Sequence, residues 1–341
     1  MKRSDSLRAL DAPTGFPPQR SADAVTLYLF LLVSLVALWC AEAAASDPAP
    51  TEQLERMSTA LRSLSYEGTI VYLHERRLET LRIVHRVEEG QVHEQLISLN
   101  GPVRTLTREK GRVICRLSDS HRISVNGRGV GKDVLHAWSL DPGTLGDHYR
   151  VQALGAARVA NRQTEAVGII PRDALRYGYR FYLDRESGLP LKSDLMGQEA
   201  DPIEQVMFTS LSLLPLRGSA PVATDPASPR RRSDAEGVVP ESLVWRFASL
   251  PPGFSPVMYD HWRDAGGQPV EHFVLSDGLA SVSVYVEGDP QEGLQGSTHI
   301  GAVYAAGGRV ADHQITVVGE VPLETVEAVL TGIRYVPGAR R

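Results

Sequence analysis

The stretch Gly68-Thr69-Ile70-Val71-Tyr72-Leu73 decides the fold class of this sequence. Its β-branched and aromatic residues are typical of a β-strand. The segment Leu78–Val87 repeats this composition after a turn at Glu75-Arg76-Arg77. Two strand-like segments joined by such a short turn predict an antiparallel β-hairpin.

Further turns and strands extend this pattern toward the C-terminus. Pairs of turn-forming residues follow at intervals of roughly ten residues, which predicts an antiparallel meander. These pairs are Glu89-Gly90, Asn100-Gly101, Lys110-Gly111 and Asn126-Gly127. After a less regular segment, the strand-like composition resumes at Glu165–Ile170, Tyr177–Leu183, Leu191–Leu195 and Ile203–Leu211.

A helix is predicted before the first strand, because Leu54, Met57, Leu61 and Leu64 recur at helical spacing and form one apolar stripe. About ten strands with one or two helices predict a large, strongly curved antiparallel sheet that closes partly over a helix. The fold class is therefore α+β.

The composition changes after this region. Four prolines lie between Ala220 and Pro240, together with several serines and the run Arg230-Arg231-Arg232. Such a segment buries too little apolar area to fold. We therefore interpret 216–241 as a Pro/Arg-rich linker.

The linker separates a first domain at 46–215 from a second at 242–336, and a short tail at 337–341 follows. In the second domain, apolar residues alternate along Leu279–Val286 after a turn at Ser276-Asp277-Gly278. These features predict a hairpin within a small α+β domain that contains an antiparallel sheet.

Two more elements are predicted in this second domain. A second hairpin is expected to turn at Gly307-Gly308. A helix is expected to begin at Pro322, with Leu323, Val326, Leu330 and Ile333 on its apolar side.

Residues 1–45 have the order of a secretory signal peptide. Basic residues precede the apolar run Val25–Trp39, and Ala43-Ala44-Ala45 follows it. The run of 15 residues is shorter than the roughly 20 that span a bilayer. Cleavage is expected after Ala45, with Ala43 as the other candidate position and an uncleaved anchor as the open alternative. The predicted mature protein is soluble and periplasmic.

The two cysteines fit this interpretation. Trp39 stands where a lipid-attachment motif needs a small residue, so Cys40 is expected to leave with the signal peptide without being lipidated. Cys115 is then the one cysteine of the mature chain, which excludes an internal disulfide. We interpret it as a buried apolar thiol in a strand.

No catalytic motif is found in the 341 residues. The motifs H-E-x-x-H, C-x-x-C and G-x-S-x-G are absent, and Gly127–Lys132 lacks the spacing of a phosphate-binding loop. The net charge of −5 gives no basic field for nucleic acid. The sequence therefore predicts a binding protein that is not an enzyme, with no cofactor and no metal.

Several ordered segments resemble the RseB/MucB family. In the first domain they are Ser65–Tyr72, Leu81–Arg86, Leu99–Pro102, Gly188–Ser193 and Glu204–Phe208. In the second domain they are Leu250–Phe254, Ser276–Ser283 and Val317–Pro322. The resemblance covers roughly residues 50–336, which is both predicted domains in order. The long leader and the Pro/Arg-rich linker depart from the family pattern.

The resemblance implies a periplasmic negative regulator of an envelope-stress sigma factor. Such a protein binds the periplasmic region of a membrane anti-sigma factor of the RseA/MucA type and shields it from proteolysis. The first domain is implied to be a large curved antiparallel half-barrel that resembles lipoprotein carriers and senses a lipid or lipopolysaccharide ligand. The second domain is implied to bind the anti-sigma factor. A lipid or lipoprotein carrier is the alternative, and a homo-oligomer is left open.

Two sets of side chains are the candidates for these roles. A curved sheet can present an apolar concave face to an acyl chain, and we expect its lining to include Ile70, Tyr72, Leu81, Ile83, Phe181 and Met207. Trp and Arg supply much of the binding energy of protein interfaces, so partner contact is assigned to Trp245, Arg246 and Trp262. That both tryptophans are core residues is the competing interpretation.

Overall fold

One antiparallel sheet of eleven strands forms the first part of the chain in the computed structural model, here called the large sheet. The structure describes residues 48–88, 90–100, 104–109, 112–117, 122–125, 138, 140–199, 201–215, 244–264, 266–288 and 293–336. The predicted signal peptide, the linker, the Gly127–Lys132 segment and the tail lie outside these residues.

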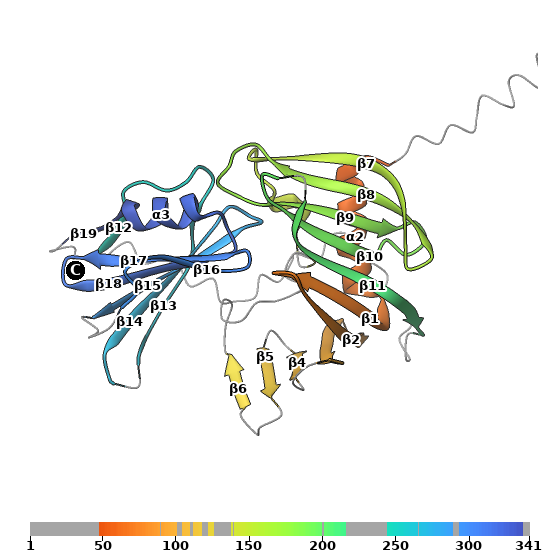
Figure 1. Ribbon diagram of the computed structural model, residues 1–341, viewed down its shortest axis with the longest axis horizontal. Coiled ribbons are helices and arrows are strands. Elements are labelled where there is room, and N and C mark those ends of the chain that lie inside the picture. Colours follow the sequence, from red (N-terminus) through yellow and green to blue (C-terminus); the bar gives the residue numbers. More distant parts are fainter. Residues whose placement is uncertain are drawn as a thin grey trace, which may run out of the picture. The chain divides into compact units, whose positions relative to one another are not determined.

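The large sheet has the strand order β6-β5-β4-β3-β2-β1-β11-β10-β9-β8-β7, so β6 and β7 are its two edges. Figure 1 shows its strands curving around helix α2. The strands are β1 (Ser65–His74), β2 (Arg77–Glu88), β3 (Gln91–Ser98), β4 (Arg104–Glu109), β5 (Arg112–Leu117), β6 (Arg122–Val125), β7 (Tyr149–Val159), β8 (Arg162–Pro171), β9 (Gly178–Asp184), β10 (Pro190–Met196) and β11 (Pro202–Leu214).

The β1–β2 hairpin has the tight turn that the sequence predicts. Glu75 and Arg76 both have positive φ angles, 46° and 62°, and His74 pairs with Arg77. Two left-handed residues match the twist of the flanking strands. The predicted β1–β2 hairpin is thus confirmed, and Cys115 lies in β5 as expected. The predicted turns at Glu89-Gly90, Asn100-Gly101, Lys110-Gly111 and Asn126-Gly127 lie wholly or partly outside the described residues.

Helix α2 (Pro50–Ser63) packs its predicted stripe against the large sheet. Leu54, Met57 and Leu61 are buried, while Leu64 follows the helix as its C-cap. The segment between β6 and β7 contributes the short helix η2 (Pro142–Thr144) next to α2.

A second antiparallel sheet, here called the small sheet, has the strand order β13-β14-β15-β18-β17-β16. Helix α3 (Leu323–Gly332) packs on β17 and β18, and the pair β12 (Trp245–Phe247) and β19 (Ile333–Tyr335) lies beside it (Figure 1). The strands are β13 (Ser255–Arg263), β14 (Pro269–Ser276), β15 (Ser281–Gly288), β16 (Gly296–Ile300), β17 (Val303–Val310) and β18 (His313–Gly319).

Two predicted details of the small sheet are wrong. Gly307-Gly308 lies inside β17, and the hairpin turns at Ala311-Asp312 instead. A Cβ at Gly307 would lie 2.2 Å from the carbonyl oxygen of Leu294, so the glycine serves close packing. Helix α3 begins after Pro322, but Ile333 belongs to β19 rather than to the helix.

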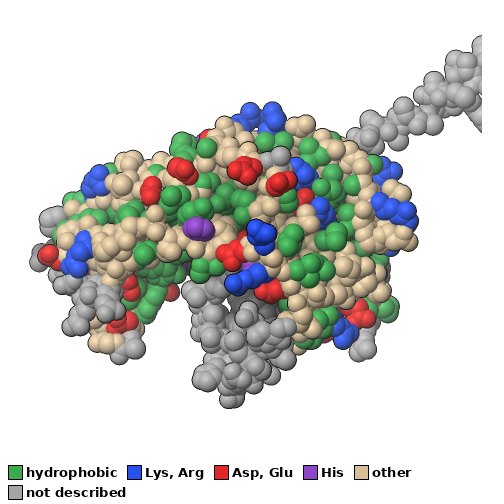
Figure 2. Space-filling view, viewed as in Figure 1, with side chains coloured by type: hydrophobic (Ala, Val, Ile, Leu, Met, Phe, Trp, Pro, Cys, Tyr) green, Lys and Arg blue, Asp and Glu red, His purple; other side chains and the backbone are tan. Residues whose placement is uncertain are grey.

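The α+β fold with two antiparallel sheets is confirmed. Both sheets belong to one compact unit, Ala49–Arg341. Within the described residues, no helix has the length and apolarity to cross a membrane. On the face drawn in Figure 2, basic and acidic side chains are interspersed.

Candidate functional site

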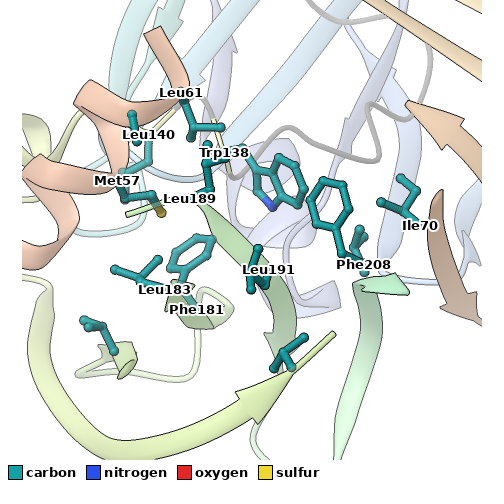
Figure 3. Close-up of a cluster of buried hydrophobic side chains, with 14 of the residues drawn as sticks. Met57, Leu61, Ile70, Trp138, Leu140, Phe181, Leu183, Leu189, Leu191 and Phe208 are labelled. Carbon is teal, nitrogen blue, oxygen red and sulfur yellow. The ribbon is translucent and has the colours of Figure 1, made fainter. Parts of the chain in front are cut away.

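Five of the six predicted lining residues meet in one apolar cluster of the large sheet. Ile70, Ile83 and Phe181 are fully buried, and Tyr72 and Leu81 nearly so. Figure 3 shows Trp138 next to Phe208, with Ile70 on the other side of the Phe208 ring, while Met57 and Leu61 come from α2. We call the full set the large-sheet cluster; it also contains Leu54, Ala60, Tyr66, Leu96, Leu140, Tyr149, Val159, Val167, Ile169, Leu183, Leu189, Leu191, Val206 and Leu279.

Met207 is placed differently from the other five. It is half-buried and lies in β11 between Val206 and Phe208, which are both buried. It pairs with Val71 and Lys192. Met207 packs against the large-sheet cluster as a partly buried residue, whereas the other five belong to its buried part.

Polar groups fix two positions in the large-sheet cluster. The indole Nε1 of Trp138 donates to Ser193 Oγ at 3.1 Å, and the Trp138 ring stacks on Phe208 with centroids 5.7 Å apart. The hydroxyl of Tyr72 donates to Glu204 Oε2 at 2.6 Å. Burial and this carboxylate raise the pKa of Tyr72 well above its usual value, so the phenol stays neutral.

The three predicted partner-binding residues differ in how exposed their side chains are. Trp245 is only 3% exposed and belongs to the core of the small sheet. Its Nε1 donates to Glu271 at 3.1 Å. Arg246 is exposed, and Trp262 is 41% exposed on the edge strand β13. The structure leaves Arg246 and Trp262 accessible to a partner and gives Trp245 a packing position.

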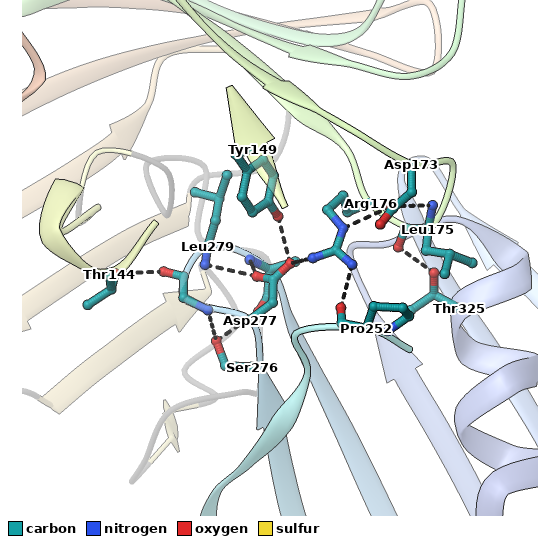
Figure 4. Close-up of polar contacts among 12 residues, drawn as sticks. Thr144, Tyr149, Asp173, Leu175, Arg176, Pro252, Ser276, Asp277, Leu279 and Thr325 are labelled. Carbon is teal, nitrogen blue, oxygen red and sulfur yellow. Dashed lines mark hydrogen bonds and ion pairs between the residues drawn. The ribbon is translucent and has the colours of Figure 1, made fainter. Parts of the chain in front are cut away.

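The sequence did not predict the junction between the large and small sheets, which is centred on Arg176 (Figure 4). Arg176 is fully buried. Its Nη1 donates to Asp277 Oδ2 at 2.5 Å, its Nη2 to the carbonyl of Pro252 at 2.6 Å, and its Nε to Asp173 Oδ1 at 2.9 Å. The guanidinium also lies 5.3 Å from the ring centre of Phe254. We call the described residues up to 215 the large-sheet region and those from 244 onward the small-sheet region. Arg176 of the large-sheet region thus holds two segments of the small-sheet region.

Asp277 connects the two sheets through its two carboxylate oxygens. Oδ1 accepts from the backbone N–H groups of Leu279 and Ala280, at 3.0 and 2.7 Å. Oδ2 accepts from Arg176 and from the hydroxyl of Tyr149 at 2.8 Å. One oxygen therefore shapes the turn of its own hairpin, and the other binds the large-sheet region.

The pKa shifts at the junction favour its observed charges. Burial and then the Asp277 carboxylate raise the pKa of Tyr149, so its phenol remains a donor. Burial alone would lower the pKa of Arg176, but Asp173 and Asp277 outweigh it and the pKa is raised. The positive charge of Arg176 is therefore retained inside the protein.

Other contacts surround this ion pair. Thr325 Oγ1 donates to the carbonyl of Leu175 at 2.5 Å, Thr144 Oγ1 to the carbonyl of Gly278 at 3.1 Å, and Tyr179 to Glu320 at 2.9 Å. Gly278 has φ +101°, and a Cβ there would lie 2.1 Å from the carbonyl oxygen of Thr144. Only glycine fits this approach.

Several of these contacts are made by residues of the sequence segments that carry the resemblance in the second domain. Pro252 and Phe254 lie in Leu250–Phe254, Asp277 lies in Ser276–Ser283, and Glu320 lies in Val317–Pro322. Each segment therefore reaches the large-sheet region. The sequence singles out Asp277 only as part of the predicted Ser-Asp-Gly turn. No pattern in the sequence around Arg176 indicates that it is buried.

The contacts of this site are suited to binding apolar groups and to holding the two sheets together. Across the described residues, no cluster of three His, Cys, Asp or Glu side chains is arranged to hold a metal ion. At the junction the guanidinium of Arg176 is paired with the carboxylates of Asp173 and Asp277, and the cluster next to it is apolar.

Comparisons with known proteins agree with these observations. Residues 49–231 match the family described as MucB/RseB N-terminal domain, and residues 239–334 match MucB/RseB C-terminal domain. The matches follow each other in the chain in the order that the resemblance predicts.

Individual relatives extend over nearly the whole chain. The sigma factor AlgU regulatory protein MucB of Pseudomonas aeruginosa is 33% identical, with 93% of this chain and 99% of MucB covered. The sigma-E factor regulatory protein RseB of Escherichia coli K12 is 25% identical, with 90% and 98% covered. Both names describe regulators of sigma factors.

Solved structures show the same relationship. The Pseudomonas aeruginosa MucA/MucB complex has a chain that is similar with a TM-score of 0.64 and 31% identity, covering 85% of this chain and 99% of that one. A crystal structure of MucB matches with a TM-score of 0.57 and 32% identity, covering 85% and 99%. Since both parts of the chain match the same family in order, and a relative one-third identical spans almost its full length, this chain belongs to the MucB/RseB family.

Proposed function

We propose that this protein is a non-catalytic periplasmic regulator that binds the periplasmic region of a membrane anti-sigma factor. Bound in this way, it shields the anti-sigma factor from regulated proteolysis, and a lipid or lipopolysaccharide-type signal releases it. The observation that carries the proposal is the ordered match of both parts of the chain to the MucB/RseB family.

Solved complexes of relatives support the partner class. One structure contains MucA with MucB, and another contains MucB with the periplasmic region of MucA. The second has a TM-score of 0.63 to this chain and is covered along 100% of its length. An equivalent anti-sigma factor is therefore the expected partner of this protein.

The accessible candidates of the small-sheet region support partner binding there. Trp262 lies on an edge strand, where an extended segment of a partner can add a strand by backbone hydrogen bonding. Its ring packs edge-on against His272 and Tyr285, with centroids 6.0 and 6.3 Å away. A tryptophan fixed by its neighbours loses little conformational entropy when a partner covers it.

The large-sheet cluster supports the lipid signal. Five residues predicted from the sequence to line an apolar face converge there. Each methylene group of an acyl chain gains about 0.8 kcal/mol when it is buried among such side chains. A carrier of lipids or lipoproteins would use the same region, but it has no evident need for the small sheet.

Affinity capture from solubilised envelope, followed by mass spectrometry, identifies the partner. We expect a membrane anti-sigma factor, and calorimetry with its purified periplasmic region should then give a saturable dissociation constant. A lipid fragment below its micelle threshold should raise that constant, whereas its polar headgroup alone should not. Capture of lipoproteins without an anti-sigma factor would support the carrier instead. A constant unchanged at saturating lipid fragment would remove the release step.

A further inference from the structure

One residue of the small-sheet hairpin belongs to the core of the other sheet. Leu279 lies in the turn Ser276–Ala280 between β14 and β15, here called the hairpin tip. It is 7% exposed and is part of the large-sheet cluster. All other buried members of that cluster lie between Leu54 and Phe208. The small sheet thus fills part of the apolar interior of the large sheet.

The same hairpin tip carries the buried ion pair. Asp277 is two positions before Leu279, and its Oδ1 accepts from the Leu279 N–H at 3.0 Å. Its Oδ2 accepts from Arg176 at 2.5 Å, and both side chains have 0% exposure. Because one carboxylate binds both groups, Leu279 cannot leave the large-sheet cluster without a movement of Asp277 relative to Arg176.

We propose that Leu279 occupies the space of an acyl chain in the large-sheet cluster, and that the Arg176–Asp277 pair holds it there. An acyl chain that enters displaces the hairpin tip, which separates this pair and loosens the small sheet from the large sheet. This inference rests on the proposed function, since it gives lipid release of the partner a structural route.

The packing of the two sheets makes Leu279 the member that can move. Strand pairing or α2 holds most of the other residues of the cluster, whereas Leu279 lies in a turn that is attached to another sheet. Separation of the ion pair exposes both charges to water, which hydrates them and offsets part of the lost attraction. The bound and displaced arrangements therefore form a two-state element that a ligand can bias through its differential affinity.

The Asp277→Asn variant tests this coupling in the full mature protein. The asparagine Oδ1 can still accept from the Leu279 and Ala280 N–H groups, while its amide group faces the donors of Arg176 and Tyr149. The probe is dansyl-undecanoic acid below its micelle threshold, followed by fluorescence. We expect the variant to bind the probe more tightly, within the roughly 5- to 150-fold range of allosteric coupling.

The matched control is Asp184→Asn. Asp184 is another buried carboxylate paired with an arginine, Arg162, but both residues belong to the large-sheet region away from the hairpin tip. Its probe affinity should equal that of the parent protein. A second variant, Leu279→Ala, leaves the ion pair in place and vacates the apolar space. It should also bind the probe more tightly than the parent does.

A distance measurement distinguishes displacement of the hairpin tip from binding of the probe without any movement of the two sheets. Spin labels at Leu78→Cys and Ile300→Cys, which are 56% and 76% exposed, report on the two sheets in a Cys115→Ser background. Saturating probe should change the interspin distance in the parent protein and leave it unchanged in Leu279→Ala. An unchanged distance in the parent, or equal probe affinity of the parent, Asp277→Asn and Leu279→Ala, overturns the inference.

Failure of the proposed function gives a different result. If the probe changes the interspin distance but does not change the dissociation constant of the anti-sigma factor region, the coupling between the sheets holds and lipid release of the partner is wrong. If the probe weakens partner binding while the distance stays constant, the displacement of Leu279 is wrong and the release proceeds by another route.

Discussion

The side chains of Arg176 and Asp277 meet at 2.5 Å although the residues are 101 positions apart, and neither side chain is exposed. Burial of a charge is costly unless it is paired and hydrogen-bonded. The pair satisfies this condition with additional bonds to Asp173, Tyr149 and the carbonyl of Pro252. It therefore connects two sheets that belong to different regions of the sequence.

Asp277→Ala is expected to lower the free energy of unfolding by about 3–5 kcal/mol, because it leaves a buried guanidinium without its partner. Urea denaturation followed by tryptophan fluorescence measures this loss. The double variant Arg176→Met, Asp277→Asn removes both charges, keeps an acceptor for the Leu279 and Ala280 N–H groups, and should be more stable than Asp277→Ala. A loss below about 1 kcal/mol, the value of an exposed pair, would contradict the buried role.

Asp184 should make stability depend on pH. Burial alone would raise its pKa, but hydrogen bonds from Arg162 and Ser187 outweigh this effect and the pKa is lowered. A lowered pKa in the folded state adds stability above the ordinary pKa, and the contribution is lost as the pH falls through the folded value. Asp184→Asn should cost about 1–3 kcal/mol at neutral pH.

Urea denaturation of the parent and of Asp184→Asn between pH 7 and pH 3 measures this dependence. The gap between their unfolding free energies should narrow toward the acid end. A gap that is constant over the range would show that Asp184 stabilises the fold by packing and neutral hydrogen bonds rather than by its charge.

Gly278→Ala should destabilise the protein more than Gly90→Ala does. Both glycines have positive φ angles, +101° and +73°, but a Cβ at Gly90 meets nothing within 4 Å. Gly90→Ala therefore reports backbone strain alone, about 1–2 kcal/mol. Gly278→Ala adds the clash with Thr144, and thermal unfolding of the two variants compares them. Equal losses would mean that the hairpin tip can withdraw from Thr144 at no cost.

Trp262→Ala should weaken binding of the anti-sigma factor region by 2 kcal/mol or more, as is typical of a hot-spot residue. Calorimetry measures the dissociation constant. Ile300→Ala removes another exposed apolar side chain of the small sheet, on its opposite edge strand, and should have no effect. Equal effects of both variants, or none from either, would place the partner elsewhere.

Export should yield a protein that begins near Ser46 and carries no lipid. The charged, apolar and small segments of residues 1–45 and the position of Trp39 before Cys40 motivate this expectation. Intact mass spectrometry of the periplasmic protein gives the answer. A mass that includes the leader, or an acylated Cys40, would require an anchored protein instead.

Local patterns were sufficient to predict most strands and both helices. The alternation along Leu279–Val286 correctly predicts that Val282, Val284 and Val286 are buried. The run Val206-Met207-Phe208 is apolar at every position, so its pattern does not indicate which residue faces inward, and a shift of one residue reverses the faces. The pattern therefore does not show that Val206 and Phe208 are buried while Met207 is only partly buried.

Such local patterns could not predict the junction between the large and small sheets. Arg176 lies in a loop just before β9, where an arginine is ordinarily solvated, and its partners Pro252 and Asp277 lie more than seventy positions away. Nothing periodic in either segment indicates the other. Only the tertiary fold shows that the Ser-Asp-Gly turn, predicted as an ordinary hairpin turn, is buried against another sheet.

The position of Leu279 also means that the core of the large sheet is not complete within the segment that forms its strands. Every strand of that sheet ends by Leu214, whereas one buried residue of its core follows sixty-five positions later. A fragment that ends between these two residues would contain the whole sheet but leave part of its apolar interior unfilled. Such a fragment should be prone to aggregation, because incompletely folded proteins aggregate through exposed apolar surface.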